Sequence, residues 1–348
     1  MAGMRGVVRK ILFPAGKGGK WMEKDITTKN LLENNDVFAD IANVNLFGGD
    51  LVIKQEDLEE MPADASYKDL EGRRHKLSRD ILKKVNRLGG CIAFIGYENQ
   101  TGINNVMPVR NMGYNYTVYA KQIQHLVAEN RKNKKSAYAK VLHDHQKLMP
   151  VATFVLYYGK KRWRKPLTLM DVLDIPEEDR GIWEKLLSDY RIKVIHMADQ
   201  PEELRKMYRS DYRVIADYLA YRKNKKKLYA SLREDRREII HVEQLLDMLS
   251  ALSGDGRFDE IRESYVNSED KEEGMNMCTL LDMCEKEGMK KGVKEGMKKG
   301  VKKGMKRGVK KGITLTKKVL QMDAQGRSME EIAGELNVKG TVVKRILS

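Results

Sequence analysis

A strand-like segment that ends in a carboxylate and an amide is the first part of this sequence that could carry out chemistry. Residues 91–95 are apolar at both odd and even positions, which is typical of a central strand covered on both faces. Glu98 and Gln100 follow this apolar run. Because side chains at positions i and i+2 of a strand share a face, we expect these two polar groups to point into the same space.

The preceding segment supplies a second carboxylate. Residues 74–86 are predicted to form a strand that a tight turn, centred on Gly89, joins to the apolar one. That register puts Asp80 opposite Glu98 and Ser78 opposite Gln100. Directly opposed Cβ atoms lie about 4.5–5.5 Å apart. Two carboxylates at that separation repel unless a proton or cation lies between them, so the pair suits a hard divalent metal such as Mg²⁺.

Several segments around these residues are similar to one known family. They are residues 37–43 (VFADIAN), 79–80 (RD), 96–101 (GYENQT), 107–110 (MPVR) with Tyr114, and 154–159 (FVLYYG). Together they resemble the Rpn family of bacterial recombination-promoting nucleases, often labelled transposases, within the PD-(D/E)XK nuclease superfamily. The resemblance covers about residues 25–250. Gln100 stands where the superfamily usually has lysine.

The resemblance implies a fold and an activity. The fold is α/β, with a restriction-endonuclease-like core of a mixed central sheet flanked by helices. The activity is that of a Mg²⁺-dependent DNA endonuclease in which Asp80 and Glu98 hold the metal. Gln100 is then expected to position water through its amide, since it lacks the charge of a lysine. The supporting residues that the resemblance implies are Asp40, Arg110, Tyr114 and Gln122.

Two rival functions stay open. One is a catalytically silent protein that keeps the fold and serves DNA binding or oligomerisation. The other is a phage-defence nuclease that uses the same chemistry as a recombination nuclease. The sequence contains both carboxylates, which favours an active enzyme over a decayed one.

Two further polar patterns have competing interpretations. On a predicted helix over residues 29–46, the polar residues Asp36, Asp40 and Asn43 recur on one side, which is either a solvated face or, as the resemblance favours for Asp40, a face toward the site. His143 and His145 could bind a metal, but no third ligand lies nearby in the sequence.

The charge is concentrated near the C-terminus. The whole chain of 348 residues carries a formal charge of +16. Residues 288–311 contain eleven Lys or Arg and one acid, so they carry +10 and leave +6 for the rest. Such a segment predicts a polyanionic partner, here DNA. The basic residues expected to contact it are Lys290, Lys291, Lys298, Lys299, Lys302, Lys303, Lys306 and Arg307.

The same segment is a tetrapeptide repeat. Glycine recurs every fourth residue from 288 to 312, each time followed by Met, Val or Ile. Because each glycine costs a helix about 1 kcal/mol, the segment is expected to be a poor helix alone, ordered by nucleic acid or by a second copy of itself. The second alternative would make a homo-oligomer through this tail, and the helical region before it could likewise pair protomers or instead pack on the nuclease core.

Composition, together with what the resemblance implies for the core, divides the chain into five parts. They are a disordered leader (1–24), the nuclease core (25–165), a helical subdomain (166–275), the basic repeat (276–313) and a small helix-turn-helix-like module (314–348) in which Ser328 caps a short helix. Three scattered cysteines fit a reduced cytoplasm, and no apolar run approaches the length of a membrane span.

Overall fold

The computed structural model describes residues 29–68, 74–87, 90–132, 142–267 and 275–348. The predicted leader (1–24) lies outside these ranges. The described chain divides into two compact units, residues 1–281 and 282–348. Each unit is considered by itself below.

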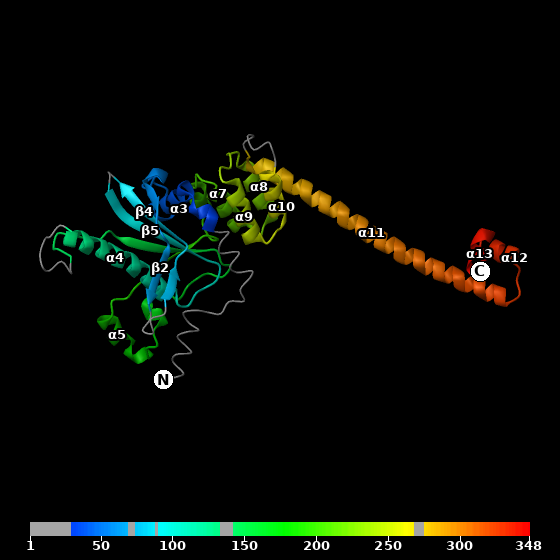
Figure 1. Cartoon of the computed structure of the whole chain (residues 1–348), viewed down its shortest axis with the longest axis horizontal. Coiled ribbons are helices and arrows are strands. Elements are labelled where there is room, and N and C mark those ends of the chain that lie inside the picture. The colour runs from blue at the N-terminus through cyan, green and yellow to red at the C-terminus, as the bar shows by residue number, and fades with distance from the viewer. Residues whose placement is uncertain (1–28, 69–73, 88–89, 133–141, 268–274) are drawn as a thin grey trace. The chain divides into compact units, whose positions relative to one another are not determined.

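The first unit is an α/β structure built on a five-stranded mixed sheet of order β1-β4-β5-β6-β7 (Figure 1). Its strands are β1 (Leu58–Glu60), β4 (Ile81–Arg87), β5 (Gly90–Gln100), β6 (Val151–Tyr157) and β7 (Lys193–His196). β1, β4 and β5 pair antiparallel, whereas β5, β6 and β7 pair parallel. The strand predicted to be central, β5, is the middle one, which confirms the α/β class and the mixed sheet.

The predicted hairpin register is confirmed over most of its length. Ile81 pairs with Tyr97 and Leu82 with Gly96, so Asp80, one residue before β4, comes level with Glu98. The predicted strand over residues 74–86 is, however, two strands. β3 (Arg74–Ser78) pairs with β2 (Asp64–Lys68) in a separate two-stranded sheet, where Ser78 lies opposite Asp64. The expected pairing of Ser78 with Gln100 is therefore wrong.

Two helices cover the opposite faces of the large sheet. α4 (Met107–Lys132) lies on the face that carries Glu98, because Arg110 and Tyr114 on this helix donate to the Glu98 carboxyl. On the other face, Tyr97 of β5 donates to the carbonyl of Phe38 in α3 (Asn35–Phe47), and the two rings are 4.3 Å apart. α3 ends where Gly48 adopts a left-handed conformation (φ 65°).

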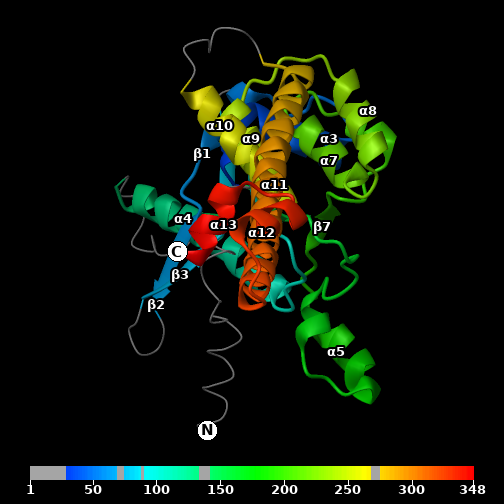
Figure 2. The same cartoon turned by 90° about the vertical axis from the view of Figure 1, so that its right-hand side faces the viewer.

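The region predicted to be wholly helical also completes the sheet. β7 lies within residues 166–275 and pairs parallel with β6, so the core extends past the predicted boundary at residue 165. The helices of this region are α5 (Arg180–Leu186), α6 (Glu202–Lys206), α7 (Tyr212–Tyr221), α8 (Lys225–Glu234), α9 (Val242–Ser253) and α10 (Arg257–Val266). Figure 2 shows α7, α9 and α10 gathered together, with α5 apart from them. Trp183 and Leu186 are exposed on α5.

Short elements occupy the segment between α3 and β3. The 3₁₀ turn η1 (Gln55–Asp57) leads into β1, and β2 follows. Two further 3₁₀ turns, η2 (Leu169–Val172) and η3 (Glu177–Asp179), precede α5.

The repeat segment is helical, contrary to the sequence-based expectation of a poor helix. α11 (Met277–Ala324) runs through all its glycines without interruption. Its first turns bury Met277 and Leu280, and its last turns bury Val319 and Met322. Because both ends of the helix are packed, tertiary contacts offset part of the cost of the glycines between them.

A three-helix module closes the chain. The end of α11, α12 (Met329–Glu335) and α13 (Gly340–Leu347) enclose a small core of Val319, Met322, Ile332 and Val343. Ser328 accepts a hydrogen bond from the backbone N–H of Glu331, which confirms the predicted cap. The two short helices are therefore present, whereas the comparison with a helix-turn-helix module stays a prediction.

Candidate functional site

The two carboxylates of the candidate site come together at one end of the sheet. Asp80 Oδ2 accepts a hydrogen bond of 2.6 Å from the backbone N–H of Asn99 in β5. Glu98 lies one residue before Asn99 on the same strand and is only 2 % exposed. The negative charge of Asp80 contributes to raising the pKa of Glu98, as expected for neighbouring acids.

The two oxygens of Glu98 have different surroundings. Oε1 accepts hydrogen bonds from Arg110 Nη2 (3.0 Å), Gln100 Nε2 (3.2 Å) and the Tyr114 hydroxyl (3.3 Å). Oε2 is buried and has no hydrogen-bond partner among the described residues. Burial is the main cause that raises the pKa of Glu98 to about 8, and Arg110 and Tyr114 act against it. The site thus holds a buried carboxyl with one oxygen still available.

Helix α4 supplies both of the larger groups that contact Glu98. Arg110 and Tyr114 are one helical turn apart, so they share a face of α4. Arg110 Nε lies 3.0 Å from the Tyr114 hydroxyl, which fixes the guanidinium beside the carboxyl. The proximity of Glu98 favours the charged guanidinium, and the pKa of Arg110 is raised despite the opposing effect of burial.

A second arginine lies beneath the site. Arg79 is 2 % exposed and donates to Thr153 Oγ1 (2.9 Å) and to the backbone carbonyl of Tyr114 (2.5 Å). Desolvation lowers the pKa of Arg79 to about 10, so it is still a cation at neutral pH. Gly96 permits this arrangement, because a Cβ there would lie 2.8 Å from Arg79 Nη1.

The sequence did not identify Arg79 as a site residue. Its only signal was its position next to Asp80 in a segment similar to the nuclease family. In the structure it links β6 to α4 and places a positive charge close to Glu98, and that charge helps to keep the carboxyl ionisable.

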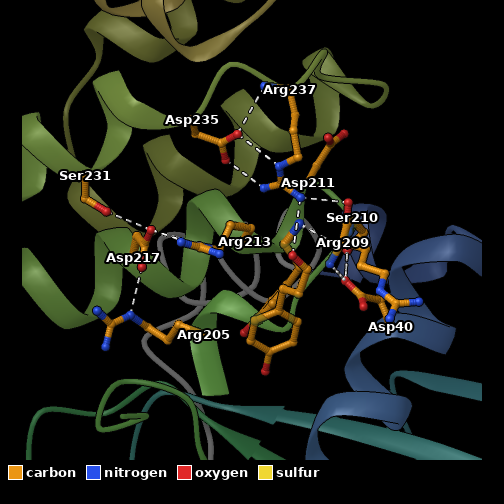
Figure 3. A network of polar contacts seen from close by, with 12 residues as sticks. Asp40, Arg205, Arg209, Ser210, Asp211, Arg213, Asp217, Ser231, Asp235 and Arg237 are labelled. Carbon is orange, nitrogen blue, oxygen red and sulfur yellow. Dashed lines mark hydrogen bonds and ion pairs between the residues drawn. The ribbon is translucent and has the colours of Figure 1, made fainter. Parts of the chain in front are cut away.

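Asp40 was expected to face the site, but its side chain binds a different part of the chain. Its Oδ2 accepts hydrogen bonds from the backbone N–H groups of Arg209 and Ser210, both 2.8 Å, and from Ser210 Oγ at 2.7 Å (Figure 3). Its neighbours on the same stripe have similar roles. Asp36 pairs with His241, and Asn43 binds the backbone of Ile53. The polar stripe of α3 is therefore neither solvated nor catalytic, because it holds other parts of the chain in place.

Gln122 likewise has a structural position. Its side chain donates to the carbonyl of Met149 and accepts from the N–H of the same residue, so it fixes the segment that leads into β6. Twelve residues separate Gln122 from Arg110, which corresponds to about 18 Å along a helix. Gln122 therefore does not belong to the Glu98 cluster.

The residues present are suited to a divalent cation, although few of them converge. Among the described residues, no group of three or more His, Cys, Asp and Glu side chains gathers in a way that could hold a metal. Asp80 and Glu98 carry hard carboxylate oxygens of the kind that such a cation prefers, and the buried Glu98 Oε2 has no donor among the residues that the structure describes. The rings of His143 and His145 are stacked with centroids 5.8 Å apart, and no third ligand from the described part of the chain joins them.

The basic residues predicted to bind DNA lie on α11. Lys290, Lys298, Lys299, Lys302, Lys303, Lys306 and Arg307 are exposed, whereas the side chain of Lys291 is outside the described part of the chain. Apolar residues between them are exposed as well, including Met297 (69 %) and Val301 (61 %).

Within the ranges that the structure describes, no helix has the length and apolar character to cross a membrane.

Comparison of the chain with protein-family models, with curated proteins and with solved structures found no match in any of the three. The functional conclusion therefore depends on the geometry of the site and on the residues that form it.

Proposed function

We propose that this protein is a divalent-metal-dependent DNA endonuclease of the PD-(D/E)XK type, whose active site is formed by Asp80, Glu98 and Gln100. The observation that supports this best is the state of Glu98. A carboxyl group is buried beside a second acid, with one oxygen held by three donors and the other without any. A bound cation would offset both the burial and the repulsion between the two acids.

Asp80 and Glu98 would hold the metal, which for phosphodiester hydrolysis supplies an activated water and neutralises charge on the phosphate. The protein side chains have separate tasks. The Gln100 amide donates a hydrogen bond to Glu98 Oε1 and holds this oxygen in place. The amide therefore lies directly beside the carboxyl group. Arg110 contributes a cation beside the carboxylate pair, suited to bind a phosphate oxygen when a substrate is present.

The test is cleavage of supercoiled plasmid DNA with and without Mg²⁺. We expect nicking by the wild-type protein only with Mg²⁺, and no nicking by Asp80→Ala or Glu98→Ala. Glu203→Ala is the matched control, since it removes an exposed carboxylate on α6. Cleavage by Glu98→Ala at the wild-type rate would remove this carboxyl from the mechanism.

A second candidate is a DNA-binding protein without catalysis. The exposed basic residues of α11 and the helix-turn-helix outline of α12 and α13 favour it. The same assay separates the two functions, because this candidate binds the plasmid and leaves it supercoiled. Whether cleavage serves recombination or defence against phage depends on the DNA that is cut.

A further inference from the structure

A short loop after β6 concentrates positive charge outside the basic tail. In the basic loop (residues 160–165, KKRWRK), five of six residues are Lys or Arg, and none is acidic. All five are exposed, whereas the sixth, Trp163, is 2 % exposed. A run of basic residues that surrounds a buried aromatic side chain is a loop held at its centre, with its charges directed to solvent.

The core of the first unit anchors Trp163. Its indole Nε1 donates to the carbonyl of Pro166 at 3.0 Å. Its ring meets the Tyr157 ring edge to face, with centroids 5.2 Å apart. Met107 and Ile192 belong to the same buried cluster. The loop is therefore fixed to the sheet at its midpoint, which reduces the entropy that a ligand would otherwise lose in ordering it.

The anchor places the basic loop at the end of the sheet that carries the candidate site. β5 and β6 run parallel, and Tyr157 of β6 lies opposite Gln100 of β5. The N–H of the next residue, Tyr158, donates to the Gln100 carbonyl at 2.8 Å. On the helix side, Met107 packs in the Trp163 cluster and precedes Arg110 by three residues. Both strand ends thus lead to one region, one ending in site residues and the other in the basic loop.

The turn into the loop depends on close packing. A Cβ at Gly159 would lie 2.1 Å from the Tyr157 ring, a distance that no side chain tolerates. Only glycine therefore lets the chain leave β6 across this ring. The direction in which the basic loop starts is set by the same tyrosine that lies opposite Gln100.

Most of the charge on the basic loop is not neutralised by the part of the chain that the structure describes. Lys165 pairs with Asp171 at 3.2 Å. Among the described residues, no hydrogen bond or ion pair engages the side chains of Lys160, Lys161, Arg162 or Arg164. Arg164 also lines a cavity of about 370 Å³, but this cavity has a mixed lining, in which Arg180 is paired with Glu184 and the acids Asp171 and Asp189 are present, so it adds nothing to the free charge of the basic loop. A chain of phosphates has the charge and the spacing to meet such a set of free cations.

We propose that the basic loop binds the phosphate backbone of the DNA on one side of the bond that the site cleaves. This inference depends on the proposed nuclease function for its position relative to the cut, but the phosphate binding itself does not require catalysis. The basic loop fixes the position of the strand, whereas the exposed lysines of α11 supply affinity that is not tied to the sheet.

The experiment measures binding of a 30-base-pair duplex of random sequence to the full-length chain in EDTA, over a series of salt concentrations. The loop variant carries Lys160→Ser, Lys161→Ser and Arg162→Ser. The matched control carries Lys223→Ser, Lys226→Ser and Lys227→Ser, three exposed lysines at and before α8. Both variants lose three charges, so they have equal net charge. Unfolding in urea checks that both keep the fold.

The slope of log K against log salt is negative, and each lost phosphate contact reduces its magnitude by about 0.9. We expect the magnitude of the slope for the loop variant to decrease by about 2 to 3, with affinity at least tenfold weaker at 0.1 M salt, and the control to keep the wild-type slope. Equal slopes in the two variants would overturn the proposal.

Cleavage in Mg²⁺ is measured separately. A loop variant with a raised KM and an unchanged kcat places the contact in substrate binding and supports the proposal. If the loop variant cleaves DNA at the wild-type rate with an unchanged KM, the proposed role of the basic loop is refuted, whereas the proposed nuclease function is unaffected. If neither the wild type nor either variant cleaves DNA, but the loop variant still changes the slope of log K against log salt, the nuclease function is refuted. Phosphate binding by the basic loop is then still supported.

Discussion

Glu98 should make the stability of the first unit depend on pH in an unusual direction. Its pKa is raised from 4.5 to about 8, because the carboxyl is buried next to Asp80. In the unfolded chain it ionises near 4.5, so between these two values the folded state binds a proton that the unfolded state has lost. The free energy of unfolding must then fall as the pH rises through this window. The stabilising contribution is complete below pH 4.5 and is lost above pH 8.

The size of the effect follows from the shift. One proton gives a slope of at most about 1.4 kcal/mol per pH unit, and the whole window corresponds to roughly 5 kcal/mol. Glu98→Gln is the matched variant, because glutamine keeps the shape and cannot ionise. Other titrating groups, such as His241, are the same in both proteins and cancel in the difference. We therefore expect Glu98→Gln to gain stability relative to wild type as the pH rises from 5 to 8.

Urea unfolding at several pH values, followed by tryptophan fluorescence, measures this difference. Trp163 packs against Tyr157, the neighbour of Gln100 in the sheet, so it reports on the correct part of the molecule. The burial argument is refuted if the two curves stay parallel. It is also refuted if the wild type becomes more stable relative to Glu98→Gln as the pH rises. In that case the effect of Arg110 on the pKa of Glu98 would outweigh the effect of burial.

Three further outcomes are expected. Gln100→Ala removes one donor to Glu98 Oε1, so the Mg²⁺ concentration for half-maximal cleavage should rise about tenfold. A lower maximal rate at an unchanged Mg²⁺ requirement would show instead that the glutamine positions water. Asp40→Ala leaves two backbone N–H groups without their acceptor and should cost about 2–4 kcal/mol in urea unfolding, with cleavage per folded molecule unchanged; a loss of cleavage at full stability would return Asp40 to the site. Ile332→Ala opens a cavity in the C-terminal module and should abolish hydrogen-exchange protection in α12 and α13, while amides of β5 keep theirs; loss of protection in β5 would show that the two units unfold together.

Sequence reasoning predicted the centre of the site because its signals are local. The continuous apolar run of β5 and the turn predicted at Gly89 together predict the register, and that register brings Asp80 level with Glu98. Arg110 and Tyr114 could be expected from the resemblance, and their spacing of four residues puts them on one face of a helix. These inferences needed only neighbours in the chain.

The failed predictions involve partners far away in the sequence. Asp40 was expected to face the site, but its partners lie 169 and 170 residues later. β7 has only four residues, and its pattern does not distinguish it from the helices around it. The sequence did not predict that Ser78 belongs to a second sheet. Only the pairing of β3 with β2 shows that the chain leaves one sheet after Ser78 and enters the other. In each case the deciding contact is tertiary, so no local pattern encodes it.

The polar stripe of α3 has a consequence for synthesis. Asp36 lies 205 residues before its partner His241, and Asp40 is bound by residues 209 and 210. At about 5–20 residues per second, a ribosome needs roughly 10–40 s to make the chain between Asp36 and His241. During that interval the first helix of the core carries acidic groups with no partners, and the sheet lacks β7. The first unit can therefore complete its folding only late in translation, and a nascent chain stalled before residue 209 should remain open to proteases and chaperones.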